Sequence, residues 1–213
     1  PAGFARGLRL ALLGQTESRG TILVTSAQTH AGSSLIAELL AWSASKPGKT
    51  LLIDLDYLAN AGLSARYPQH KTGFSARLED RCATPQAVVS LADNLDFMPR
   101  GELNDSTLLL LTSQRLPALL TTLRQTYDSL ILNAPSLGLA QDGLLLAPHV
   151  DISLLVVKAS EQASRVRDAQ SRLHAAAPTP VAIMLNQVKE ENLETQEGKR
   201  LPERGMGELI SPK

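Results

Sequence analysis

Residues 21 to 34 read Thr21-Ile-Leu-Val-Thr-Ser-Ala-Gln-Thr-His-Ala-Gly-Ser-Ser34, and this stretch decides the fold class. Its first five residues are apolar or β-branched, which favours a buried strand. Small residues follow, and Leu35, Ile36, Leu39 and Leu40 then recur at the spacing of one helical face. A strand, a short loop and a helix in this order form the repeating unit of α/β proteins.

The same alternation continues along the chain. We predict buried strands at 21–25, 50–54, 95–98, 129–133, 152–157 and 181–186, each short and almost wholly apolar. Helical periodicity predicts helices at 33–45, 107–126, 141–147 and 163–176, with a new helix beginning near Pro117. The pattern indicates an α/β fold, doubly wound, with a mainly parallel sheet and helices on both faces.

One domain over residues 1–188 accounts for these elements, because 213 residues supply one sizeable core. We expect an N-terminal helix at about residues 3–13. The polar stretch 57–84 is interrupted by glycine and proline, which predicts a long connection with one short helix near 74–81. Residues 189–213 are rich in Glu, Lys, Gly and Pro, and we expect a flexible polar tail.

Composition excludes several classes of function. The 21 Lys and Arg balance the 21 Asp and Glu, so no net field attracts nucleic acid, and we predict no nucleic-acid partner. Aromatic residues make up 3% of the chain, which leaves little material for stacking on bases. The single cysteine, Cys82, can form no internal disulfide and suits a reducing cytoplasm. The apolar runs are far shorter than the ~20 residues of a membrane span.

The loop after the first strand partly matches a phosphate-binding loop. That motif, G-x-x-x-x-G-K-[ST], places a lysine on the terminal phosphates and a hydroxyl on magnesium. Gly32 and Ser34 keep the last glycine and the hydroxyl, whereas Ala27 and Ser33 replace the first glycine and the lysine. The alternative is an ordinary βα turn in which Ser33 or Ser34 caps the helix. The candidate nucleotide-binding residues of the loop are Thr29, His30, Ala31, Gly32, Ser33 and Ser34.

Further segments, in a fixed order and spacing, carry a family resemblance. They include Leu51-Leu-Ile-Asp-Leu-Asp56, Asn94-Leu-Asp-Phe-Met-Pro-Arg-Gly101 and Tyr127-Asp-Ser-Leu-Ile-Leu-Asn-Ala-Pro135. From Phe4 to about Val188, the chain resembles the cytoplasmic ATPase domain of the bacterial tyrosine kinases (BY-kinases). These kinases accompany polysaccharide copolymerases in capsule and exopolysaccharide export and are relatives of the ParA and MinD ATPases. The resemblance implies a sheet of the P-loop NTPase type.

This sequence departs from the family pattern where the chemistry is carried out. The family's phosphate-loop lysine corresponds to Ser33, and the aspartate that ends its Walker B strand corresponds to Asn133. Phosphoryl transfer depends on cations and metal around the developing charge, and losing such groups typically costs orders of magnitude in rate. Taken together with the resemblance, these two degenerate positions imply that no catalytic residue is present.

Other residues retain the family pattern. Asp54 and Asp56 match the two aspartates of its second acidic motif and, with Ser34, are candidate magnesium ligands. The alternative is an exposed turn with two solvated carboxylates. Asn186 ends a strand where relatives hold the adenine base, so we predict that it either binds a nucleobase or satisfies a loop.

Two features of the family concern assembly. Its kinases end in clustered tyrosines, whereas the tail after residue 189 has none, which excludes autophosphorylation of that tail. Its ring-forming helix carries E-x-x-R-x-x-R, of which Arg6 and Arg9 remain while the glutamate is lost. With Phe4, these arginines are candidate interface residues. The alternatives are a solvated helix face for the arginines and a core position for Phe4.

The resemblance implies a catalytically degenerate relative, a pseudokinase that regulates or scaffolds exopolysaccharide or capsule biosynthesis and export. Its expected partner is an inner-membrane polysaccharide copolymerase or related export protein, and a homo-oligomer is also compatible. The expected location is the cytoplasm, with peripheral attachment to the inner membrane through that partner. No cofactor is required, and any binding of ATP, ADP or magnesium is weak. The alternatives are a weakly active ATPase or tyrosine kinase, and a ParA/MinD-like positioning protein. Gln28, where those positioning proteins carry a signature lysine, counts against the last alternative.

Overall fold

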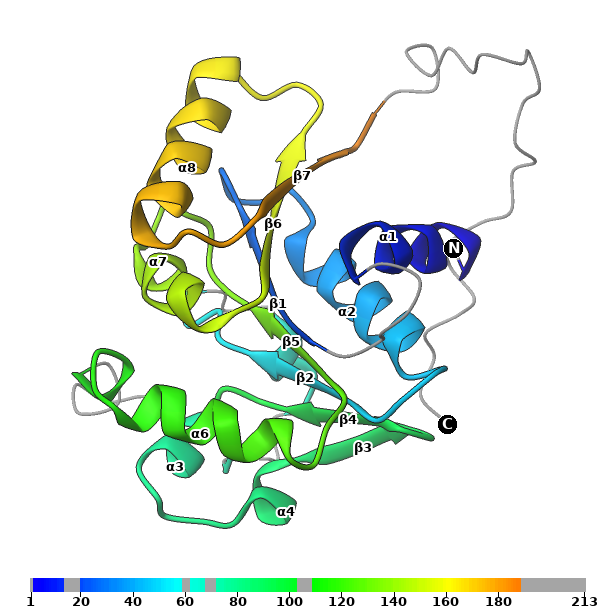
Figure 1. The fold of residues 1–213 in the computed structure, drawn as a ribbon, viewed down its shortest axis with the longest axis vertical. Helices are drawn as coiled ribbons and strands as arrows, with labels where there is room; N and C mark the ends of the chain where they lie inside the picture. The colour runs from blue at the N-terminus through cyan, green and yellow to red at the C-terminus, as the bar shows by residue number, and fades with distance from the viewer. Residues whose placement is uncertain (1, 14–19, 59–61, 68–71, 103–108, 189–213) are drawn as a thin grey trace.

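A seven-stranded sheet lies at the centre of the protein in the computed structural model (Figure 1). The structure describes residues 2–13, 20–58, 62–67, 72–102 and 109–188. The strand order is β3-β4-β2-β5-β1-β6-β7, and every neighbouring pair in it is parallel except β3 with β4. The strands are β1 (Gly20–Ser26), β2 (Thr50–Asp54), β3 (Val89–Ala92), β4 (Leu95–Met98), β5 (Ser129–Asn133), β6 (Ile152–Lys158) and β7 (Val181–Asn186). The predicted doubly wound, mainly parallel fold is confirmed, and the six predicted strands occur within one residue of their expected bounds.

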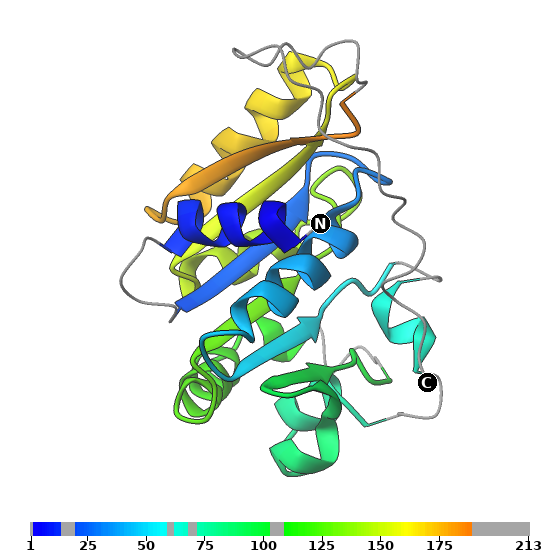
Figure 2. The same ribbon diagram turned by 90° about the vertical axis from the view of Figure 1, so that its right-hand side faces the viewer.

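Helices cover both faces of the sheet (Figures 1 and 2). On one face lie α1 (Ala2–Leu13) and α2 (Ser33–Ala44), and on the other lie α6 (Arg115–Arg124), α7 (Asp142–Leu146) and α8 (Ala163–Ala176). Each face has its own apolar cluster. Leu23 and Leu155 belong to one cluster, whereas Ile22 and Leu154 belong to the other. Because successive strand residues point to opposite faces, the central strands must be apolar throughout, which is why the sequence pattern revealed them.

The segment between β2 and β4 contains more structure than the sequence predicted. A short helix occurs near the expected place, as α3 (Phe74–Leu78), but η1 (Leu63–Arg66) and α4 (Thr84–Ala87) accompany it. The edge strand β3 was also missed. Its four residues alternate between half-buried and exposed, so they lack the continuous apolar run that marks the inner strands.

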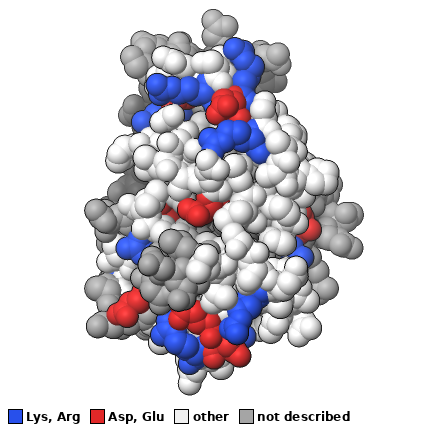
Figure 3. Space-filling view, turned by 90° about the vertical axis from the view of Figure 1, so that its left-hand side faces the viewer, with Lys and Arg blue, Asp and Glu red and all other residues white. Residues whose placement is uncertain are grey.

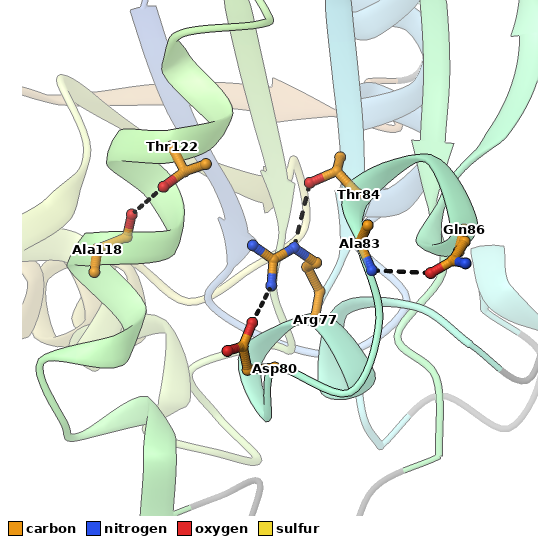
Figure 4. Close-up of polar contacts among 7 residues, drawn as sticks. All are labelled: Arg77, Asp80, Ala83, Thr84, Gln86, Ala118 and Thr122. Carbon is orange, nitrogen blue, oxygen red and sulfur yellow. Dashed lines mark hydrogen bonds and ion pairs between the residues drawn. The ribbon is translucent and has the colours of Figure 1, made fainter.

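Polar contacts fix the connection from α3 to α4 (Figure 4). The Arg77 Nε donates to the Thr84 hydroxyl at 3.3 Å, and its Nη1 donates to the Asp80 carboxylate at 3.2 Å. The Ala83 backbone N–H donates to the Gln86 side-chain oxygen at 3.0 Å, at the start of α4. These contacts are made by polar side chains with no helical periodicity, so the pattern of apolar residues gave no sign of them.

Most of the predicted helices are present. The expected N-terminal helix is α1, and the helix expected at 163–176 is α8. The helix expected to restart near Pro117 is α6, which begins two residues earlier, at Arg115. The predicted helix at 141–147 is α7, followed by the 3-10 turn η2 (Ala147–His149). The tail predicted at 189–213 lies outside the described residues, and the boundary at 188 stays a prediction.

Within the described ranges, no helix is long and apolar enough to cross a membrane.

Candidate functional site

The loop between β1 and α2 ends at a glycine that caps the helix. Gly32 is the N-cap of α2, with φ 87° and ψ 18°, and its carbonyl accepts the Ile36 N–H at 3.1 Å. Ser33 and Ser34 are the first two helical residues, so the alternative in which one of them is the N-cap is wrong. In the described part of the chain, no side chain caps this end. The N–H groups of the first helical turn therefore remain directed at the loop, where the helix dipole favours an anion.

The end of β7 fixes the outer side of this loop. The Asn186 side-chain Nδ2 donates to the Ala31 carbonyl at 2.8 Å, and the Gln187 Nε2 donates to the His30 carbonyl at 2.9 Å. A Cβ on Gly32 would collide with the Asn186 Nδ2, which would have to shift, and the positive φ of Gly32 also disfavours a residue with a side chain.

The two carboxamides bind carbonyl oxygens of the loop and occupy none of its N–H groups. Asn186 thus satisfies the loop, one of its two predicted roles, and contact with a nucleobase stays a prediction. Gln187 was not singled out in the sequence, although its place directly after Asn186 at a strand end was a usable signal. His30 and Gln187 both have positive φ, 58° each, at this contact.

The second group of site residues lies at the carboxyl ends of β2 and β5. Asp54 and Asn133 are paired in register on these neighbouring strands, and both side chains are fully buried. The Asn133 Nδ2 donates to the Asp54 Oδ1 at 2.9 Å. The expectation that Asp54 is a solvated carboxylate is therefore wrong, because its oxygens are bound within the protein.

Ser64 completes the surroundings of Asp54. Its backbone N–H and its hydroxyl both donate to the Asp54 Oδ2, at 2.8 and 2.6 Å, and the Asp56 N–H donates to the Oδ1 at 3.2 Å. The Ser64 hydroxyl in turn accepts the Arg100 N–H at 2.9 Å. The Arg100 Nη1 donates to the Asp56 carbonyl at 2.9 Å. We call these five residues, which include Asn133, the Asp54 network.

This network bears on the magnesium site that the fold family implies. An ionised carboxylate has about four lone-pair sites, and Asp54 accepts four hydrogen bonds from its own chain. The hydrogen bonds from the protein therefore occupy all the acceptor sites of the Asp54 carboxylate. This arrangement does not fit a carboxylate that also ligates Mg²⁺ through one of its oxygens. Magnesium ligation by Ser34 and Asp56 stays a prediction. The Ser34 side chain is half-buried, and the Asp56 Oδ1 accepts the Leu58 N–H at 3.2 Å.

A buried phenol lies beside the same edge. Burial raises the pKa of Tyr57 above its ordinary value of 10.0, and the carboxylates of Asp142 and Asp54 raise it further. Its hydroxyl has no hydrogen-bond partner among the described residues, and the same is true of the Asn133 Oδ1 and the Ser136 hydroxyl. Asn133 is the last residue of β5, and Tyr57 and Ser136 lie three residues after the ends of β2 and β5, so unpaired oxygen atoms lie in the same part of the chain as the well-bonded Asp54.

The N-terminal helix presents part of its predicted interface to solvent. Phe4 is 52% exposed, so the alternative that places it in the core is wrong. Arg6 is exposed, whereas Arg9 is only half-buried and is therefore not on a fully solvated face. Ala5, between Phe4 and Arg6, is fully buried, and α1 packs against α2.

A small hollow of about 250 Å³ separates the start of the phosphate-loop segment from α8. Gln28, Gly138, Arg165 and Arg172 are among its lining residues. Figure 3 shows basic side chains gathered at the end of the molecule where α8 lies, with acidic groups among them. The Arg172 Nη1 lies 3.8 Å from the Asp168 Oδ2, one helical turn earlier in α8. The charge of this face is therefore mixed.

The comparisons with known proteins agree with this geometry. No protein-family model matches the chain. The tyrosine-protein kinase CpsD of Streptococcus pneumoniae serotype 4 is 26% identical over 171 residues, covering 78% of this chain and 75% of the kinase. A Klebsiella pneumoniae protein described as a tyrosine-protein kinase in the cps region is 28% identical over 167 residues. That alignment covers 76% of this chain and only 23% of the Klebsiella protein.

Solved structures show the same fold. The kinase domain of the Escherichia coli tyrosine kinase Etk superposes with a TM-score of 0.77 at 23% identity, covering 92% of this chain and 80% of that domain. A plasmid partition protein from Borrelia burgdorferi B31 bound to AMPPNP superposes with a TM-score of 0.62 at 20% identity, covering 81% of this chain and 77% of that protein. The chain is a homologue of the bacterial tyrosine kinases and has the P-loop ATPase fold that their kinase domains share with partition proteins.

Proposed function

We propose that this protein is a non-catalytic homologue of the bacterial tyrosine kinases that regulates or scaffolds exopolysaccharide or capsule biosynthesis and export. The observation that carries the proposal is the hydrogen bond from Asn133 to Asp54. The family resemblance places an aspartate at position 133, beside the metal and phosphates. Here a neutral amide stands there and donates to the neighbouring carboxylate, so this position supplies no negative charge to a metal ion.

The phosphate loop supports the same conclusion. Ser33 begins α2 at the position of the family's lysine, and a hydroxyl supplies no permanent positive charge to a terminal phosphate. The backbone amides at the start of α2 remain, and they attract phosphate without a lysine. We therefore expect nucleotide affinity no better than roughly the high-micromolar range, because one charge-assisted contact of about 1.5–3 kcal/mol is missing.

The proposed partner is an inner-membrane polysaccharide copolymerase or a related export protein. Support comes from the Klebsiella relative in a cps region and from α1, which exposes Phe4 and Arg6. The protein would then work in the cytoplasm and reach the membrane through this partner. A complex with further copies of the same chain would use the same exposed helix.

A calorimetric titration with ATP and ADP, with and without magnesium, tests the proposal together with assays of hydrolysis and tyrosine phosphorylation. We expect weak binding, little effect of magnesium and no measurable turnover. The matched control is Ser34→Ala, which removes the hydroxyl that an active loop would place on magnesium and leaves the Asp54 network intact. A steady turnover that disappears in Ser34→Ala would show an active enzyme and contradict the proposal.

The same titration separates the positioning-protein alternative. Such a protein would associate in response to ATP, and light scattering during the titration measures that response. We expect the molecular mass to be the same with and without ATP, because Gln28 stands at the position of the signature lysine. A mass that doubles only with ATP would favour the positioning function.

A further inference from the structure

Asp54 and Asn133 occupy a place where two acidic groups would be unstable together. They are register partners on adjacent parallel strands, and each is fully shielded from solvent. Two carboxylates on paired residues of adjacent strands repel strongly in a low-dielectric surrounding. One of them must then be protonated, or a cation must lie between them. An asparagine at one of the two positions removes the repulsion.

The orientation of Asn133 follows from the charge of its neighbour. Only its NH₂ group can face a carboxylate favourably, and the Nδ2 lies 2.9 Å from the Asp54 Oδ1. The Oδ1 of Asn133 then points elsewhere, and it is buried without a hydrogen-bond partner in the described part of the protein. An unpaired buried oxygen costs free energy, so the contact to Asp54 must outweigh that cost.

The remaining donors come from a different segment. Ser64 donates twice to the Oδ2 of Asp54 and accepts the Arg100 N–H, which ties η1 and the segment after β4 to the end of β2. The Asp54 carboxylate itself holds η1 and β5 to the end of β2, and Arg100 is joined to it through Ser64.

We propose that the Asn133 amide takes the place of a cation beside Asp54. The Asp54 network then holds η1 and β5 to the end of β2 without a metal ion and is metal-independent. This inference deepens the proposed function and rests on it, because a catalytic site of this fold would keep an ion at this edge. It concerns the folded state without nucleotide, so it can fail while the proposed regulatory role stands.

The test compares thermal unfolding of the full chain and two variants in EDTA and in millimolar Mg²⁺ at matched ionic strength. We expect the melting temperature of the parent protein to be the same in both buffers. Asn133→Asp should melt lower in EDTA by about 6–12 °C, since it buries a second carboxylate without a partner. Mg²⁺ should restore at least half of that loss. Asn133→Ala, the matched control, should melt about 3–6 °C lower in both buffers, because it removes the hydrogen bond and adds no charge.

Three outcomes would overturn the inference. A parent protein that melts higher in Mg²⁺ would show that its folded state binds the ion, which contradicts a metal-independent network. An Asn133→Asp variant as stable in EDTA as the parent would show that no cation or amide is needed there. An Asn133→Asp variant that Mg²⁺ does not restore, or that folds in neither buffer, would show that the amide does not stand in for an ion.

Discussion

Ser33 lies at the first position of α2, at the end of the helix that attracts anions. An ammonium group there would reach a terminal phosphate, so Ser33→Lys should tighten ATP binding by about 10- to 100-fold, the equivalent of one charge-assisted contact. Hydrolysis should stay poor, because Asn133 still fills the position of the family's aspartate. Calorimetry measures the first effect and phosphate release the second.

The control for this prediction is Ser33→Gln, which adds similar bulk without charge and should leave the affinity close to that of the parent. If Ser33→Lys alone produced the turnover of an active kinase, Asn133 would not be a disabling substitution.

Tyr127 is a second residue whose surroundings have a measurable effect. It is 4% exposed, and its hydroxyl donates to the Asp96 carboxylate at 2.8 Å. Burial, this hydrogen bond and the charge of Asp96 all raise its pKa above the ordinary value of 10.0. A raised pKa favours the neutral phenol in the folded state, so the stability from this group is complete below pH 10 and is lost as the pH rises above it.

Tyr127→Phe should therefore lower the free energy of unfolding by about 1–2 kcal/mol at pH 8. It should also flatten the decrease in stability above pH 10, as measured by urea unfolding across that range. Tyr67→Phe is the matched control, since the Tyr67 ring packs on Phe97 with centroids 5.2 Å apart and should keep its stability within about 0.5 kcal/mol. Equal pH profiles for the parent and Tyr127→Phe would contradict the assigned hydrogen bond.

Among the elements, the strands buried on both faces of the sheet were predictable from the sequence, whereas the short elements outside the centre of the sheet were not. The strands β1, β2 and β5 are buried along almost their whole length and have apolar residues at their centres, because each faces a helical layer on both sides. By contrast, η1 is four residues long with a single fully buried residue, Leu63, so no periodicity marks it. Its importance lies in Ser64, whose contact to Asp54 depends on how the chain returns to the sheet.

The contact between β7 and the phosphate loop predicts how a substitution at Gly32 changes the free energy of unfolding. Gly32→Ala should cost about 2 kcal/mol or more, because the new methyl group meets the Asn186 Nδ2 and the backbone has φ 87°. In an Asn186→Ala background the clash is gone, and only the backbone cost of about 1–2 kcal/mol should remain. A double-mutant cycle by urea unfolding measures the difference.

Strict additivity in that cycle would show that Asn186 does not approach Gly32. Gln125→Ala, an exposed carboxamide at the end of α6, serves as the control and should have almost no effect in either background.

For the whole molecule, the sequence indicated that Asp54, Asn133 and Asn186 end strands, but it did not indicate which contacts they make. Carboxyl ends of neighbouring parallel strands meet at one edge, and the fold brings Asp54 and Asn133 together at that edge. Their mutual hydrogen bond, and the roles of Ser64, Arg100 and Gln187, depend on segments that approach only after folding. The pattern of apolar residues does not encode such contacts, although the place of Gln187 after Asn186 was a local signal for one of them.

The exposed side of α1 is the surface that we propose for docking on the membrane partner. Arg6 is exposed on α1, so Arg6→Glu should leave the free energy of unfolding within about 0.5 kcal/mol of the parent. If α1 contacts the proposed membrane partner, the variant should lose co-sedimentation with membranes. Arg115→Glu, an equally exposed arginine on α6, is the control and should still co-sediment. A folded Arg6→Glu variant that co-sediments like the parent would remove α1 from the proposed interface.

We expect the Asp54 network to affect how fast the protein unfolds. The Asn133 bond closes a separation of 79 residues, and the Arg100 bond to Ser64 closes one of 36, so both carry a large loop-closure entropy. Contacts of this kind tend to form late, after the local strand-helix units have assembled. In stopped-flow experiments, Asn133→Ala should therefore speed unfolding and leave the refolding rate nearly unchanged. The network would then act as a kinetic brake on the opening of the sheet edge, and its effect on the lifetime of the folded protein would exceed its effect on folding speed.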